Sequence, residues 1–131
     1  MVDTNIVIYL LAGGPQAEAC APHLDGHALA VSFQSVGELW YGAVRREWGD
    51  RKRRKLDDVI QRMTVLTVDE AMVRIWAELR ASSEASGFTK QVADLWIAAT
   101  AKRHDLALLT NDRDFLTALD IEVIKPEIPG A

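Results

Sequence analysis

The sequence predicts an α/β fold in which a mainly parallel sheet is covered by helices on both faces. Short apolar or β-branched runs alternate along the chain with longer segments whose apolar residues recur at helical spacing, an order typical of parallel sheets. With 131 residues, 49% of them hydrophobic, the chain is long enough for one core and too short for two. We therefore expect a single domain over residues 1–131.

Turn signals and apolar spacing define the elements of the first half. Met1 and Val2 resemble the end of a strand, and the apolar run after them stops at Gly13-Gly14-Pro15, a strong break. Farther on, the segment ALAVSF has the length and flanks of a buried strand. The expected elements are a strand ending at Val2, helices over Ile6–Leu11 and Gln16–Leu24, a strand over Ala28–Phe33 and an amphipathic helix over Ser35–Trp48.

The second half of the chain continues the alternation. Gly49-Asp50 separates two helical patterns, and Gly87 is a natural stop for a long helix that opens at Asp69-Glu70. The expected elements are a basic helix over Arg51–Met63, a strand over Thr64–Val68, helices over Asp69–Ser86 and Thr89–His104, a strand over Ala107–Thr110, a short helix over Asp112–Leu119 and a last strand over Glu122–Ile124.

Two aspartates directly follow predicted strands. Ligands of parallel α/β sheets gather at the carboxyl ends of the strands, where Asp3 follows the first strand in VDTN and Asp112 follows ALLT in TNDRDF. Taken alone, either aspartate could simply cap a helix. Asp114 is close enough in sequence to supply the same carboxylate, and the distance to the strand end favours Asp112.

Asp94 is the one charged residue in the apolar helical segment QVADLWIAATA. A buried carboxylate is unfavourable unless it is paired with a cation or bound to a metal. An ion pair with Lys90, one turn earlier, is the structural alternative. We favour a metal ligand.

Glu38 is predicted to lie opposite the apolar stripe of its helix, for which a solvated side chain is the ordinary interpretation. Ser35 and Gly42 on the same face are small, so this face could border a cleft. We then expect Glu38 to act as a general base or a water-mediated ligand. The stripe consists of Val36, Leu39, Trp40, Ala43 and Val44.

Carboxylates that converge on one point repel each other, and a divalent cation is the usual reason to tolerate this. Oxygen ligands select Mg²⁺ or Mn²⁺, which activate water and stabilise the leaving oxygen of a phosphodiester. Cys20 is the single cysteine, which excludes an internal disulfide and a zinc site built from several thiolates.

The chain carries a net charge of −4, yet seven of its fifteen Lys and Arg lie between Arg45 and Lys55. This basic run is either a solvated helix face or a contact surface for RNA. Trp48, beside these charges, is the candidate for RNA or partner contact, while the other tryptophans are expected in the core. No apolar stretch approaches the roughly 18 residues of a membrane span, and the start lacks a basic flank, so we expect a cytoplasmic protein.

The strings VDTN, SVGELWYGA, ADLWIAATA and LLTNDRDF, in this order and spacing, resemble a VapC-type PIN domain from the first residues to about Phe115. The first strand departs from the pattern, because such proteins have several residues before the aspartate. The resemblance implies an α/β/α sandwich with a parallel sheet. It also implies an acidic quartet and two supporting polar residues, which map to Asp3, Glu38, Asp94 and Asp112, supported by Asn5 and Thr110.

By this resemblance the chain would be an Mg²⁺-dependent endoribonuclease and the toxin of a type II toxin–antitoxin pair. Its partners would be a small antitoxin whose C-terminal segment enters the groove, a structured RNA such as tRNA or rRNA, and a second copy of the chain. The main alternative is a catalytically silent PIN-like module that binds a partner or nucleic acid. A phosphatase with an aspartyl nucleophile needs a second Asp where this chain has Asn5.

Overall fold

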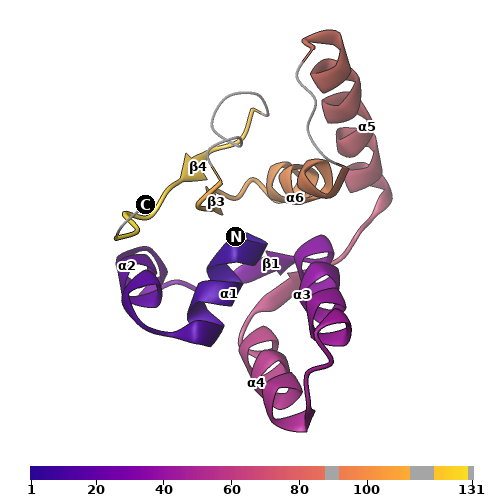
Figure 1. Ribbon diagram of the computed structural model, residues 1–131. Coiled ribbons are helices and arrows are strands. Elements are labelled where there is room, and N and C mark those ends of the chain that lie inside the picture. Colours follow the sequence, from indigo (N-terminus) through magenta and orange to yellow (C-terminus); the bar gives the residue numbers. More distant parts are fainter. Residues whose placement is uncertain (88–91, 113–119, 130–131) are drawn as a thin grey trace.

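The computed structural model describes residues 1–87, 92–112 and 120–129, and pairs of helices precede each of the strands β1, β2 and β3 along the chain (Figure 1). The helices are α1 (Thr4–Ala12), α2 (Pro15–Leu24), α3 (Phe33–Arg45), α4 (Asp50–Gln61), α5 (Glu70–Ala85) and α6 (Val92–Arg103). The strands are β1 (Ala30–Ser32), β2 (Thr64–Leu66), β3 (Leu108–Leu109) and β4 (Val123–Ile124).

All observed strand pairs are parallel, which confirms the predicted sheet. Strand β1 pairs with β2, and β3 pairs with β4. Val2 lies between the two pairs, bridging to Val31 on one side and Leu109 on the other. The predicted first strand is therefore a single bridging residue at the centre of the sheet, and it carries Asp3 to the carboxyl ends of its neighbours.

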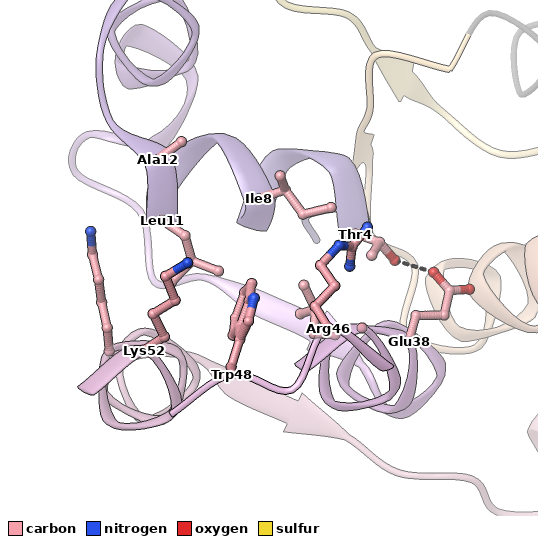
Figure 2. A pocket seen from close by; sticks show the side chains of 11 residues that line it. Thr4, Ile8, Leu11, Ala12, Glu38, Arg46, Trp48 and Lys52 are labelled. Atoms are coloured by element: carbon pink, nitrogen blue, oxygen red, sulfur yellow. Dashed lines mark hydrogen bonds between the residues drawn. The ribbon is translucent and has the colours of Figure 1, made fainter. Parts of the chain in front are cut away.

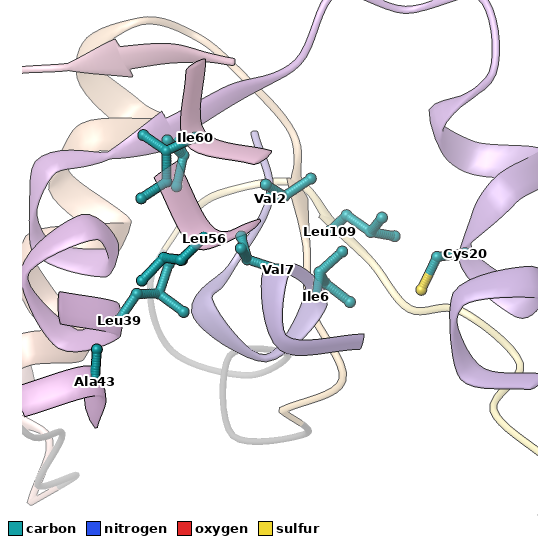
Figure 3. Close-up of a cluster of buried hydrophobic side chains, with 10 residues drawn as sticks. Val2, Ile6, Val7, Cys20, Leu39, Ala43, Leu56, Ile60 and Leu109 are labelled. Atoms are coloured by element: carbon teal, nitrogen blue, oxygen red, sulfur yellow. The ribbon is translucent and has the colours of Figure 1, made fainter. Parts of the chain in front are cut away.

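Two hydrophobic clusters occupy opposite sides of this sheet. The consecutive strand residues Leu108 and Leu109 belong to different clusters, because successive side chains of a strand point to opposite faces. The first cluster joins the sheet to α1, α2, α3 and α4 (Figure 3), and the second joins it to α5 and α6. The three-layer α/β/α arrangement follows. Trp40 packs against the first cluster and Trp76 and Trp96 against the second, as predicted for these tryptophans. Trp48, the candidate for RNA or partner contact, is partly buried against the first cluster.

Helix α3 is shifted toward the N-terminus relative to its predicted span Ser35–Trp48. It begins at Phe33, because the Ser32 hydroxyl accepts a hydrogen bond from the Gln34 N–H and caps the helix. It ends at Arg45, since Glu47 has a φ of 54°, outside the helical region. Trp48 is thus in the α3–α4 connection, and the predicted strand over Ala28–Phe33 ends at Ser32.

The predicted apolar stripe of α3 is wrong in two respects. Val44 is 60% exposed, while the buried positions of the helix are Ser35, Leu39 and Ala43. Glu38 is next to this buried stripe, not opposite it, because positions 35, 38, 39 and 42 share one helical face. Glu38 therefore lies toward the core side of the helix.

The remaining differences concern the ends of elements. The basic helix begins one residue earlier and ends two residues earlier than expected, and α1 begins two residues earlier. Strand β2, the long helix and the last two strands are each shorter than expected, by one or two residues at an end. The start of the predicted helix Thr89–His104 and all of Asp112–Leu119 except its first residue fall outside the described residues. Within the described part of the chain, no helix combines the length and apolarity that a membrane crossing requires.

One surface interaction joins α5 to α6 and gives a testable pH dependence. The Asp69 carboxylate caps α5 by accepting from the Met72 N–H at 2.8 Å, and it lies 2.9 Å from Arg103 Nη2. The hydrogen bond from Arg103 and that from Met72 hold the pKa of Asp69 below its ordinary value. Ionised Asp69 therefore contributes stability at neutral pH, and this contribution is lost as the pH falls below about 4 and through the lowered pKa.

We expect Asp69→Asn to lower Tm slightly at pH 7, because the amide oxygen keeps the cap and the ion pair is lost. The two proteins should converge in Tm as the pH is lowered toward 3. Thermal unfolding of both proteins from pH 7 downward measures this, and a Tm difference independent of pH would contradict the assignment.

Candidate metal and catalytic site

Asp3 lies at the carboxyl end of the central position of the sheet, where two hydrogen-bond donors hold its side chain. It follows the bridging residue Val2, caps helix α1 and is 5% exposed. Its Oδ1 accepts from the Thr4 N–H at 2.7 Å, and its Oδ2 accepts from the Thr110 hydroxyl at 2.6 Å. The capping alternative is therefore realised, and it is compatible with a ligand role, because each carboxylate oxygen has a second lone pair.

The Thr110 hydroxyl forms hydrogen bonds with three neighbouring residues of the site. While donating to Asp3, its hydroxyl accepts from Asn5 Nδ2 at 3.4 Å and from the Asp112 N–H at 3.0 Å. A hydroxyl has one proton and two lone pairs, so its bonding capacity is filled and its proton is directed at Asp3. The structure thus places Asn5, Thr110 and the Asp112 backbone around Asp3.

Glu38 is connected to the Asp3 segment through Thr4, the residue that follows Asp3. Its Oε2 accepts from Thr4 Oγ1 at 2.7 Å, and its Oε1 accepts from Gln34 Nε2 at 3.3 Å. Thr4 Oγ1 also lies 2.9 Å from the hydroxyl of the buried residue Ser35. Figure 2 shows the Glu38 carboxylate directed at Thr4 on the neighbouring helix. The side chain is half-buried and borders the cavity described below.

The pKa of Asp3 is shifted by its surroundings, which include two acidic side chains. Burial is the largest cause that raises the pKa of Asp3, and the negative charges of Asp94 and Glu38 raise it further. The hydrogen bonds from Thr110 and Thr4 oppose these effects. Asp94, in the first turn of α6, and Glu38, on α3, are therefore close enough to Asp3 to act on its charge.

The donor chemistry fits a hydrated magnesium ion better than an enclosed one. Within residues 1–87, 92–112 and 120–129, no group of three His, Cys, Asp or Glu side chains could hold a metal ion by itself. Mg²⁺ retains several waters and is commonly bound by one or two carboxylates together with substrate phosphates. An aspartate whose ionised form is disfavoured by burial and further by two nearby carboxylates is a group that such a cation would stabilise.

Two interpretations that the sequence left open depend on residues outside the described part of the chain. Asp114, the other candidate for the fourth carboxylate, is among them, and so is Lys90, the candidate ion-pair partner of Asp94. Asp112 itself is half-buried, and its backbone is fixed by Thr110. The choice between Asp112 and Asp114 therefore stays as the sequence left it.

Thr4 and Asn111 are site residues that the sequence reasoning missed. Thr4 joins Glu38 to the start of α1 beside Asp3, and Asn111 donates from Nδ2 to the Tyr9 hydroxyl at 2.9 Å. The Asn111 N–H also donates to Asn5 Oδ1 at 3.3 Å. The available signal was adjacency, because each residue directly follows or precedes a candidate aspartate in the chain.

A cavity of about 400 Å³ extends from Thr4 and Glu38 along α1 toward the start of α4 (Figure 2). Apolar side chains of α1 and α3 line it together with Trp48 and cations of the basic run. The lining residues from α1 are Thr4, Ile8, Leu11 and Ala12, and those from α3 and beyond are Glu38, Leu39, Gly42, Arg46, Trp48, Lys52 and Lys55.

Comparison with known proteins agrees with the fold. The family described as PIN domain matches residues 1–119. The chain is also similar to Ribonuclease VapC4 of Mycobacterium tuberculosis, with 36% identity over 127 residues that cover 95% of this chain and 94% of the relative.

Two solved structures resemble this fold. VapBC2 from Rickettsia felis, bound to a DNA fragment from its promoter, has a TM-score of 0.86 at 22% identity, covering 97% of this chain and 98% of that chain. VapBC-5 from Mycobacterium tuberculosis, a member of the VapBC family of toxin-antitoxin systems, has a TM-score of 0.61 at 30% identity, covering 73% and 80%. The predicted α/β/α fold is confirmed.

Proposed function

We propose, from the premise that this chain belongs to the PIN domain family, that it is an endoribonuclease and the toxin of a type II toxin–antitoxin system. The observation that carries the proposal is the buried Asp3 carboxylate, whose pKa is raised by burial and by the charges of Asp94 and Glu38. Such a cluster of acids at the carboxyl ends of parallel strands suits the cleavage of a phosphodiester.

Within this site, Asp3 and Asp94 would hold an Mg²⁺ or Mn²⁺ ion, with the fourth carboxylate supplied by Asp112 or Asp114. The ion, when bound, lowers the pKa of water and stabilises charge on the phosphate. Asp3 is rigid, because two donors fix both of its carboxylate oxygens. Rigidity of this kind keeps a ligand oriented before the substrate arrives.

Glu38 would take the proton from the attacking water, or hold that water in place. Thr4 donates to its Oε2 and Gln34 to its Oε1, so both carboxylate oxygens are oriented by neutral donors. A general base needs a free lone pair within reach of the water, and each Glu38 oxygen keeps one.

The natural partners follow from the same premise. We propose a cognate antitoxin as the inhibitor, a structured RNA such as tRNA or rRNA as the substrate, and a homodimer as the assembly. The alternative is a catalytically silent module that binds a partner or nucleic acid. Cleavage of purified tRNA and rRNA with Mg²⁺, compared with EDTA, tests the proposal, and the alternative requires that no RNA is cut under either condition.

Thr110 should tune the affinity of Asp3 for the metal. Thr110→Val removes the hydrogen bond that lowers the pKa of Asp3, so that pKa should rise further and protons should compete better with Mg²⁺. We expect cleavage to fall about 10- to 100-fold and its acidic limb to move to higher pH. Thr110→Ser keeps the hydroxyl and is the matched control. A pH–rate profile unchanged by Thr110→Val would contradict the assigned role.

A further inference from the structure

The cavity beside Glu38 combines features that the cleavage site itself does not use. Its wall is apolar, from Ile8, Leu11 and Leu39, and its rim carries Arg46, Lys52 and Lys55. These three cations are exposed. Glu38 is the one acid among the described lining residues, and it stands at the end nearest Asp3. The cavity is therefore a basic and apolar extension of the acidic site.

Trp48 is presented to this cavity by a fixed backbone. Its carbonyl oxygen accepts from Arg53 Nε at 2.8 Å, which holds the connection between α3 and α4 against the second turn of α4. The Nζ atom of Lys52 lies 5.7 Å from the centroid of the Trp48 ring. In Figure 2 the indole stands between Lys52 and Arg46, on the opposite side of the cavity from α1. An aromatic ring beside cations is the usual platform for an unpaired base and its phosphate.

Arg46 reaches the cavity because Gly42 has no side chain. A Cβ atom placed on Gly42 would lie 2.8 Å from Arg46 Nη1. The guanidinium therefore lies against the α3 backbone, one turn from Glu38. Since Arg46 is nearer than Lys52 to Glu38 in Figure 2, it is placed for the phosphate closest to the cleavage site.

We propose that this cavity is a nucleotide subsite, in which Trp48 stacks on an unpaired base flanking the cleaved bond while Arg46, Lys52 and Lys55 bind the adjoining phosphates. The proposal rests on the ribonuclease function proposed above. Charge favours RNA over an apolar peptide, because three cations line the cavity and phosphates supply a negative charge at each nucleotide. A volume of about 400 Å³ has room for a nucleotide.

The basic run is thereby divided into residues with different roles. Lys52 and Lys55 line the subsite, Arg53 stabilises the Trp48 connection, and Arg51 and Arg54 are exposed on the same helix outside the lining. This division gives a matched pair of variants, Lys52→Gln with Lys55→Gln and Arg51→Gln with Arg54→Gln. Both remove two positive charges from α4, and only the first pair removes them from the cavity.

The test uses a fluorescein-labelled single-stranded RNA of twelve nucleotides, its binding measured by anisotropy in EDTA across a salt series. The lysine pair should weaken binding about tenfold or more and make the salt dependence shallower by about two phosphate contacts, while the arginine pair changes both much less. Trp48→Ala should also weaken binding about tenfold, and Trp48→Phe should restore most of it. Thermal unfolding identifies any variant that is not folded.

Equal effects of the lysine and arginine pairs, or RNA binding unchanged in the lysine pair and in Trp48→Ala, would overturn the subsite. If the lysine pair weakened only the complex with an antitoxin, the cavity would be a peptide site and the proposal would be wrong. Failure of the ribonuclease function is distinguishable, because it appears as absence of cleavage by the unaltered chain with Mg²⁺, whatever these variants bind.

Discussion

Replacing Asp3 with Asn is expected to reduce Mg²⁺-dependent RNA cleavage by at least about a hundredfold, while the folded chain becomes no less stable without metal. The amide keeps an oxygen for the Thr4 N–H, so the cap of α1 is retained, while its NH2 group faces Thr110 and can only donate to that hydroxyl. What is lost is the charge that binds the cation.

The stability part of this expectation follows from the sign of the pKa shift. The pKa of Asp3 is raised in the folded chain, chiefly by burial, so ionised Asp3 opposes folding once the pH exceeds its unfolded value. This opposition is full above the folded pKa and is relieved as the pH falls through it. At pH 7 in EDTA, the Tm of Asp3→Asn should therefore equal or exceed that of the unaltered chain, and the difference should shrink in acid.

Asp69→Asn is the matched control for this variant, because it is the same substitution at an acid of the α5–α6 surface. It should keep full cleavage. Cleavage assays and Tm in EDTA, measured on both variants, separate a lost metal ligand from a damaged fold. Near-normal cleavage by Asp3→Asn would remove Asp3 from the mechanism.

Glu38→Gln should lower cleavage by about 10²- to 10⁴-fold, the usual contribution of a general base, yet weaken Mg²⁺ binding less than Asp94→Asn does. The substitution preserves the acceptor for the Thr4 hydroxyl and removes the proton-accepting carboxylate. Single-turnover cleavage at saturating Mg²⁺, together with calorimetric titration of Mg²⁺, measures the two effects separately.

The control for Glu38 is Gln34→Ala, which removes only the longer contact of 3.3 Å and should have a small effect on both measurements. If Glu38→Gln lost as much Mg²⁺ affinity as Asp94→Asn and regained cleavage at high Mg²⁺, Glu38 would be a direct ligand instead of a base.

The parallel sheet and the place of Asp3 directly after its first strand were predictable from the sequence, whereas the surroundings of Glu38 were not. Alternation of apolar runs and helical patterns identified the fold, and Asp3 was recognised by its place after the first strand. The stripe of α3 was assigned by counting large apolar residues. The buried stripe also contains the polar residue Ser35, which such counting leaves out, whereas the apolar residue Val44 is exposed.

The other features that the sequence did not predict depend on contacts between distant segments of the chain. The hydroxyl of Thr110 bonds to Asp3, 107 positions away in the chain, and no local pattern predicts such a pair. In the sequence the basic run is a single feature. In the structure its residues have different surroundings, because Arg53 donates to the Trp48 carbonyl while Lys52 and Lys55 line the cavity. Capping by Ser32 and the positive φ of Glu47 set the ends of α3, which helical spacing alone does not encode.

The most direct test of the account is RNA cleavage by the chain and by Asp94→Asn, each freed of antitoxin, treated with EDTA and then titrated with Mg²⁺. We predict that the unaltered chain cuts tRNA or rRNA as Mg²⁺ is restored, and that Asp94→Asn stays at least about a hundredfold slower at every Mg²⁺ concentration while remaining folded. Equal cleavage by the two proteins, or cleavage that persists in EDTA, would contradict a metal-dependent site built on these carboxylates.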